Sequence, residues 1–102
     1  MPQYSHTLDL TDGIAFASAL KVYTDIGDIL TEMVVDPIGA TAVCTFQQGA
    51  GTPVKPNGNP LTYDVSNGVI FAGALKVHTD IQNKLVWIVV HAAAATADCW
   101  FV

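Results

Sequence analysis

One phrase occurs twice in this chain, and its repetition limits the fold more than any other feature. FASALKVYTDI at 16–26 returns as FAGALKVHTDI at 71–81, 55 residues later. At that offset, 9–46 aligns with 64–101 without a gap, and 19 of the 38 positions are identical. A chain of 102 residues provides for one domain, so 1–102 is predicted to be two copies around one core. The Gly- and Pro-rich segment 47–60 is predicted to be the connecting loop.

Each copy is predicted to begin with two β-strands. Residues 5–10 and 61–65 lead into Thr-Asp-Gly and Ser-Asn-Gly, and Asp-Gly and Asn-Gly are strong hairpin signals because they tolerate positive φ. Segments 14–26 and 69–81 then place their large apolar residues at positions of one parity, a period of two that favours strands. A helix is the competing interpretation, because these segments also contain good helix formers.

A second hairpin follows in each copy. ILTEMVV and ATAVCTF flank a turn at 36–39, and LVWIVV and ATADCWF flank a turn at 91–94. Four strands per copy make eight in total. The predicted fold class is therefore all-β, an eight-stranded antiparallel sandwich or barrel of jelly-roll type made from two fused four-stranded repeats.

Strand alternation divides the second hairpin of copy two into two faces. Pairing Val90 with Ala95 across the turn puts Cys99 on a face of small and aliphatic residues, which we expect to point inward. In this register Trp87 lies opposite Asp98, on the other face. That other face carries Leu85, Trp87, Val89, Thr96, Asp98 and Trp100.

Copy one indicates that this second face points outward. Glu32 occupies the position of Trp87, and Thr45 occupies that of Trp100. An ionised glutamate is rarely buried without a partner, so the face should meet solvent in both copies. Copy two would then expose an apolar patch, which marks a binding surface. The predicted partner-binding residues are Trp87, Trp100, Leu85 and Val89, with Asp98 at the rim.

Two other interpretations of this face remain open. Another strand or the linker could fold over it, which would make both tryptophans ordinary core residues. Alternatively, the indoles could form a platform for a sugar or another small ligand, with Asp98 as the hydrogen-bond acceptor.

The remaining side chains predict neither catalysis nor a cofactor. Cys44 and Cys99 occupy matched inward positions and are interpreted as small buried hydrophobes, with a disulfide between them as the alternative. The three histidines show no zinc-ligand spacing and no nucleophile beside them. The repeated Asp-x-x-Asp/Asn pattern has calcium-type oxygen ligands, but these residues also form ordinary turns. We therefore predict no enzyme, no catalytic residue and no bound metal.

Composition limits the partners. The net charge is −5 and all four basic residues are lysines, so the chain offers no arginine for phosphate or guanine and nucleic acid is not an expected partner. No apolar run is long enough for a membrane span, and the first ten residues do not resemble a signal peptide. Only 13% of residues are charged, which favours surface buried against other chains, including copies of itself in a homo-oligomer. The alternative is a surface rich in Thr, Asn and Gln that needs few charges.

LTDGIAFASALKVYTDI and GATAVCTFQ, within an Ala-, Thr- and Val-rich chain of low charge, resemble the strands of the small β-rich decoration (cement) proteins of tailed phages. The resemblance implies a jelly-roll-like fold and assembly as dimers or trimers over junctions between capsid subunits. It also implies a location on the virion after assembly in the host cytoplasm. The predicted function is thus a structural binding protein that self-associates and docks on a capsid. The alternative is a lectin-like carbohydrate-binding module.

Overall fold

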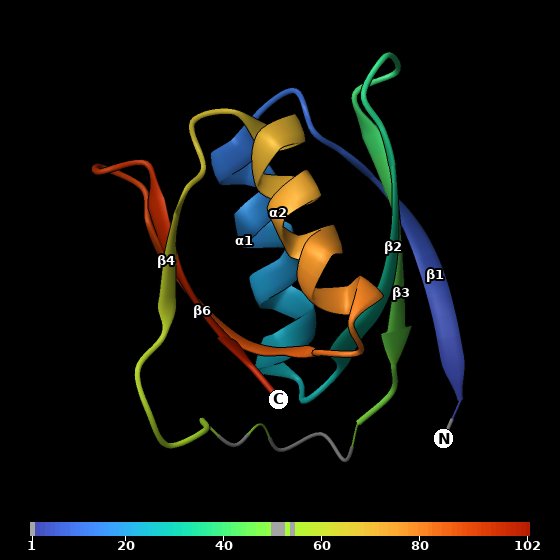
Figure 1. Ribbon diagram of the computed structural model, residues 1–102, viewed down its shortest axis with the longest axis vertical. Coiled ribbons are helices and arrows are strands. Elements are labelled where there is room, and N and C mark those ends of the chain that lie inside the picture. Colours follow the sequence, from blue (N-terminus) through green and yellow to red (C-terminus); the bar gives the residue numbers. More distant parts are fainter. Residues whose placement is uncertain (1, 50–52, 54) are drawn as a thin grey trace.

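The computed structural model describes residues 2–49, 53 and 55–102 and contains a six-stranded antiparallel sheet with two helices. Both sequence copies fold in the order strand, helix, strand, strand (Figure 1). In copy one these are β1 (Gln3–Asp9), α1 (Gly13–Asp25), β2 (Ile29–Asp36) and β3 (Thr41–Gln47). In copy two they are β4 (Leu61–Asp64), α2 (Gly68–Asp80), β5 (Leu85–His91) and β6 (Thr96–Phe101).

The prediction of strands at 14–26 and 69–81 was wrong, because both segments are helices. Asp12 and Asn67 are N-caps instead of hairpin-turn residues. The carboxylate of Asp12 accepts from the backbone N–H groups of Ile14 and Ala15 at 3.0 and 3.1 Å. Asn67 makes the equivalent bonds at the start of α2. Each cap satisfies N–H groups that have no partner within the helix.

The burial of α1 follows a helical period. Phe16, Leu20 and Thr24 are buried at intervals of four residues, whereas Val22 and Ile26 are exposed. All five positions have the same parity, so the same residues fit an alternating strand on paper. Only the difference in burial separates the two interpretations.

The predicted eight-stranded sandwich or barrel was also wrong. The chain is mostly β, so the all-β class fits only in part, and its strands form one sheet in the order β1-β3-β2-β5-β6-β4. The sheet curves around the two helices, which lie side by side within its concave side (Figure 1). Its two halves meet between β2 and β5, where the register contains the single pair Leu30 and Leu85.

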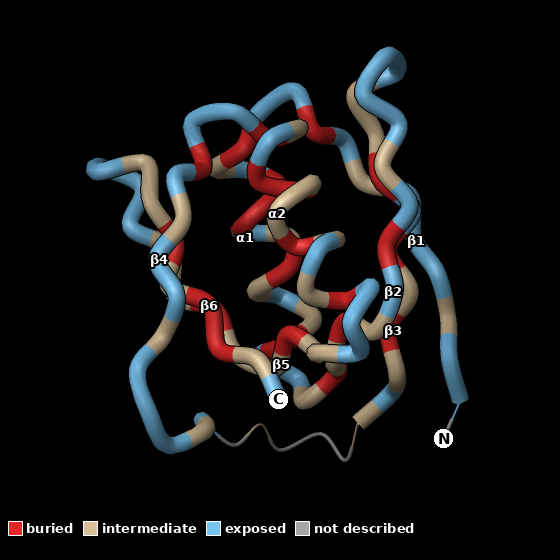
Figure 2. Tube along the Cα trace, viewed as in Figure 1, coloured by how far each residue is buried: buried red, intermediate tan, exposed pale blue. Residues whose placement is uncertain are grey.

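The helices are seated crosswise between the copies. α1 of copy one packs chiefly against β5 of copy two, and α2 packs chiefly against β2 of copy one. The matched residues Phe16 and Phe71 meet edge to face, with ring centroids 5.8 Å apart. Figure 2 shows the buried residues along the helices and the strand faces that surround them. The two copies therefore share one hydrophobic core.

Two glycines permit the closest approach between the copies. A Cβ atom on Gly13 would lie 1.8 Å from the carbonyl oxygen of Val65, and one on Gly68 would lie 2.1 Å from that of Leu10. Leu10 and Val65 are themselves matched positions of the repeat. Such reciprocal contacts between matched residues are the geometry of a two-fold axis. Any side chain at either glycine would push the helix starts away from the opposite copy.

Both cysteines are free and buried in the core, so the disulfide alternative is not what the structure contains. Cys44 lies on β3 and Cys99 on β6, each on the face that points toward the helices. Burial raises the pKa of each thiol to about 12, because an apolar environment disfavours the thiolate.

We expect Gly13→Ala and Gly68→Ala each to lower the free energy of unfolding by at least about 3 kcal/mol, because the new methyl group overlaps a backbone carbonyl. Urea unfolding at low protein concentration measures this change. Gly73→Ala in the middle of α2 is the matched control. Its methyl group would meet nothing within 4 Å, so the helix should gain about 1 kcal/mol. Unchanged stability in the first two variants would contradict the close contact between copies.

Neither thiol should react with a thiol-specific reagent in the folded protein, because both side chains are buried and protonated. Both should react once the chain is unfolded in urea. Counting labelled cysteines by mass spectrometry before and after unfolding tests this. Rapid labelling of either cysteine in the native protein would show that its strand is open to solvent.

Candidate functional site

The outer face of β5 and β6 is the candidate site. Trp87 pairs with Trp100 and Val89 with Asp98 in the register of these strands. The predicted pairing of Trp87 with Asp98 was wrong, because the turn begins after His91. The observed register therefore differs from the predicted one by two residues. Because side chains alternate with a period of two, this difference leaves each of them on its predicted face. Trp87, Val89, Asp98 and Trp100 therefore lie on one face, the side of the sheet away from the helices.

Leu85 does not belong to this face. A register shift between Leu85 and Trp87 leaves Val86 as an extra residue in β5. Such a bulge reverses the side-chain alternation on one side of it. Leu85 therefore points inward and is fully buried in the core. Its predicted position beside the tryptophans was wrong, because simple alternation cannot detect a bulge.

Trp100 is covered by the linker. Only 7% of this residue is exposed, although its strand position faces away from the helices. Its indole Nε1 donates to the carbonyl oxygen of Gly58 at 3.3 Å. The ammonium group of Lys55 lies 4.6 Å from the centre of its ring, a cation–π contact. The linker passes here because it leads into β4, the neighbour of β6. The expectation of two exposed indoles was thus wrong for Trp100.

Trp87 and Val89 remain partly exposed beside this covered indole. They lie on adjacent outward positions of β5, and their partners on β6 are Trp100 and Asp98. The open apolar surface is therefore one indole and one valine, supported from the side by Trp100. We call Trp87, Val89, Asp98 and Trp100 the outer-face quartet.

Asp98 anchors a polar cluster at one edge of the quartet. The hydroxyl of Thr62 donates to its Oδ1 at 2.6 Å, and Nε2 of His91 lies 3.1 Å from its Oδ2. The hydrogen bond from Thr62, followed by that from His91, lowers the pKa of the Asp98 carboxyl, and Lys55 contributes through its charge. The carboxylate is thus ionised at neutral pH and held by residues of three different segments.

The sequence did not identify Thr62, His91 or Lys55 as neighbours of the quartet. Thr62 lies in a segment that was read as a strand, but its pairing with β6 depends on the strand order of the whole sheet. His91 was read as a turn residue, and the linker has no periodicity that fixes its path. These three residues come together around Asp98 only in the folded chain, so no local sequence pattern identifies them.

The corresponding face of copy one has different chemistry. Glu32 pairs with Thr45 and Val34 with Val43 in the register of β2 and β3. Glu32 is exposed, and the hydroxyl of Thr45 shares a hydrogen bond with that of Ser5 at 2.8 Å. The same scaffold thus carries a charge in one copy at the position where the other carries an indole.

The repeated acidic pattern is occupied by local structure. Asp9 accepts from the backbone N–H of Thr11 at 2.8 Å, and Asp12 is an N-cap. Asp28 is buried, accepts from the backbone N–H of Gly49 at 2.9 Å, and also accepts from the hydroxyl of Tyr4. No cluster of three or more His, Cys, Asp or Glu side chains suited to a metal occurs among the described residues.

All three histidines have structural partners, and the ring of His6 lies with its centroid 5.4 Å from those of both Tyr4 and Tyr23. The ring of His78 stacks on Phe101 with centroids 4.1 Å apart and shares a hydrogen bond with the hydroxyl of Tyr63. Its Nδ1 is buried and has no hydrogen-bond partner within the described part of the chain. His91 belongs to the Asp98 cluster.

The candidate site is a surface, and the described residues enclose no pocket. No helix in the described ranges is long and apolar enough to cross a membrane. Comparisons of the chain with protein-family models, with curated proteins and with solved structures found no significant match. The geometry of the chain itself is therefore the basis for a functional proposal.

Thr62→Val should raise the pKa of Asp98 toward the ordinary value of 3.8, because it removes the hydrogen bond that contributes most to the lowering. An NMR titration of the Asp98 carboxyl carbon measures the shift. A lowered pKa contributes stability above the ordinary pKa and loses it as the pH falls through the lowered value. The stability difference between variant and wild type should thus be largest near neutral pH and shrink in acid.

Thr7→Val on β1 is the control for this variant. Thr7 is also exposed on an edge strand, and its side chain makes no hydrogen bond to the described residues. It should leave the Asp98 titration unchanged. An unchanged titration in Thr62→Val as well would show that the hydrogen bond does not control the carboxyl.

Proposed function

We propose that this protein is a structural binding protein that docks on another protein chain through the outer-face quartet, with Trp87 as the anchor. The observation that carries the proposal is the exchange between the two copies. The position that holds an exposed glutamate, Glu32, in copy one holds a partly exposed indole in copy two. Both positions belong to the same scaffold, so the fold itself does not require an indole there.

The energetics of the quartet suit an anchor with a polar rim. Trp87 still has surface to lose, and a partner that covered it would gain from desolvating a large aromatic side chain. Trp100 is already packed under the linker and supports Trp87 from the next strand. Asp98 adds a fixed negative charge at the edge, which favours a partner that offers a basic or hydrogen-bonding group.

The specific form of the proposal is a decoration protein that reinforces a capsid by docking and self-association. Its support is the composition of the chain, rich in Ala, Thr and Val and low in charge, which resembles that of phage cement proteins. The segment LTDGIAFASALKVYTDI no longer adds to this resemblance, because most of it forms helix α1 instead of a strand. The low fraction of charged residues also fits a small domain whose surface is largely covered by other proteins when it functions. The observed sheet with two helices is not the jelly-roll that the resemblance implies, so the proposal rests on composition and on the outer-face quartet instead of on the fold.

A carbohydrate-binding module is the second candidate. One observation favours it: Trp87 lies beside the polar cluster of Asp98, Thr62 and His91, a combination of aromatic face and hydrogen-bonding groups. Two features weigh against it. Trp100 is not free to stack on a sugar, and two side chains of the protein already bond the Asp98 carboxylate.

Trp87→Glu should leave the protein folded and reduce docking by about 30-fold or more, which corresponds to about 2 kcal/mol for the loss of an anchor. The protein would be incubated with empty capsids made from the shell genes of the genome that encodes it, and bound protein would be measured after sedimentation. Circular dichroism of the variant checks that it folds.

Glu32→Gln is the matched control, because it changes the same position in copy one without adding an apolar group. It should bind capsids as the wild type does. The decoration hypothesis would be contradicted if no capsid gene lies near this gene and the wild-type protein does not sediment with the capsids. Quenching of tryptophan fluorescence by simple sugars, lost in Trp87→Glu, would favour the carbohydrate-binding module instead.

A further inference from the structure

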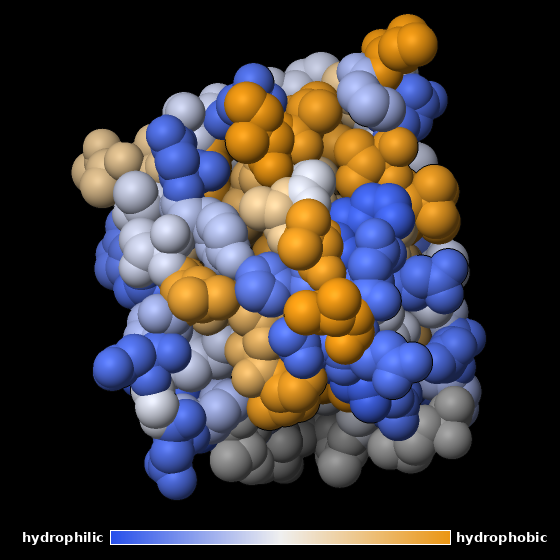
Figure 3. Space-filling model, viewed as in Figure 1, coloured by the Kyte–Doolittle hydropathy of each residue, from blue (hydrophilic) through white to orange (hydrophobic). Residues whose placement is uncertain are grey.

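The outer side of α2 is an apolar stripe with nothing packed on it among the described residues. Ile70, Val77 and Ile81 are 68%, 62% and 66% exposed. They recur at the spacing that puts residues on one face of a helix. Figure 3 shows apolar side chains along α2 on the face that it presents to the viewer. This surface lies on the helix layer, on the opposite side of the sheet from the outer-face quartet.

Gly73 lies within this stripe and has no role in internal packing. A Cβ atom built there would meet nothing within 4 Å. A glycine in the middle of a helix costs about 1 kcal/mol relative to alanine. The protein therefore carries a destabilising residue at a partly exposed position where its own fold has room for a side chain. A missing side chain at such a place lets another surface approach the helix backbone closely.

The corresponding face of α1 has part of this pattern, because Ile26 is 53% exposed and Lys21 and Asp25 form the same ion pair, but it lacks two of its elements. Ala15 stands where α2 has Ile70, and Ser18 stands where α2 has Gly73. Val22 is as exposed on α1, at 63%, as its counterpart Val77 on α2. The two helices thus share a scaffold and differ in their outer face, so α1 provides a matched control for every change in α2.

We propose that α2 pairs with α2 of a second copy of this chain, in an antiparallel arrangement with its two-fold axis near Val77. Gly73 and Ile81 lie four residues on either side of Val77. A two-fold axis at Val77 therefore brings Ile81 of each copy over Gly73 of the other. The large side chain fills the space that the glycine leaves, so the stripe is complementary to itself.

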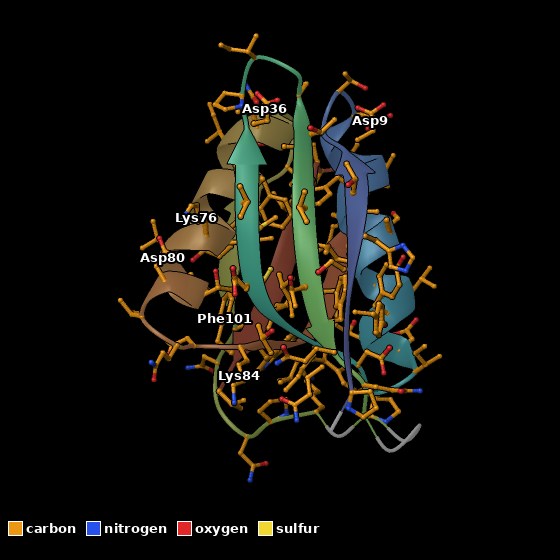
Figure 4. The ribbon with its side chains drawn as sticks, turned by 90° about the vertical axis from the view of Figure 1, so that its right-hand side faces the viewer. Asp9, Asp36, Lys76, Asp80, Lys84 and Phe101 are labelled. Carbon is orange, nitrogen blue, oxygen red and sulfur yellow. The ribbon has the colours of Figure 1, made fainter. Side chains whose placement is uncertain are left out.

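Charge favours the same occupant. Lys76 and Asp80 form an ion pair on α2 with Nζ and Oδ2 2.9 Å apart (Figure 4). They lie on either side of position 78, one residue from the proposed axis. The antiparallel arrangement therefore places Lys76 of each copy next to Asp80 of the other. Lys76 and Asp80 are four residues apart on one edge of the stripe, so two such cross-pairs would match opposite charges along that edge.

The predicted dimer is weak, because only the second half of α2 from each copy forms the interface. Interfaces this small give transient complexes. The inference rests on the self-association part of the proposed function and names the surface for it. Its test uses the purified protein alone, so it can fail independently of capsid docking. Trp87→Glu should associate as the wild type does.

Sedimentation velocity over a wide range of protein concentration tests the proposal. The wild type should shift reversibly from monomer to dimer as concentration rises. Val77→Glu should stay monomeric at all concentrations, because it buries a charge at the proposed axis. Val22→Glu, the same change at the matched position of α1, should dimerise as the wild type does. A monomeric wild type, or equal loss of dimer in both variants, would overturn the proposal.

Changes at Gly73 and at Lys76 distinguish close helix packing from non-specific hydrophobic association. Gly73→Ala should stabilise the monomer yet weaken the dimer at least several-fold, whereas Ser18→Ala should not change association. Lys76→Asp should weaken the dimer by placing like charges together, and the double variant Lys76→Asp/Asp80→Lys should restore it. If neither the Gly73 variant nor the charge variants change the dissociation constant of the dimer, the interface lies elsewhere on the molecule.

Discussion

The crosswise seating of the two helices is the interaction on which the rest of this structure depends. α1 fills the concave side of the copy-two strands, and α2 fills that of the copy-one strands. The exchange is possible because Gly13 and Gly68 let each helix start against a backbone carbonyl of the other copy. Between β2 and β5 the register contains one residue pair, so the helices contribute more than this seam does to holding the two halves of the sheet at their angle.

The sequence predicted part of this architecture, and each miss has a physical cause. The outer face of β5 and β6 was placed correctly for Trp87 and Asp98, because the register error was an even number of residues. Strands were predicted in place of the helices because Asp-Gly and Asn-Gly serve equally as hairpin turns and as N-cap pairs. Leu85 and Trp100 were misplaced because a bulge and the path of an aperiodic linker leave no local pattern.

Both surfaces that we assign to binding arise where copy two departs from copy one. The core positions are matched closely between the copies, down to the two cysteines and the phenylalanines that meet at the centre. The differences that change the character of the surface lie at outward positions, where Glu32 corresponds to Trp87 and Ser18 corresponds to Gly73. A duplicated scaffold permits this division, because one copy can maintain the fold while the exposed side chains of the other change without cost to packing.

The exchange of helices also bears on how such a chain could arise. One strand-helix-strand-strand unit, released from its counterpart, would leave the buried side of its helix uncovered and the inner face of its strands empty. A single unit could bury these surfaces only by forming a dimer with a second identical unit. The present polypeptide thus has the architecture of an ancestral two-chain assembly whose subunits became joined end to end, after which each half was free to acquire its own exterior.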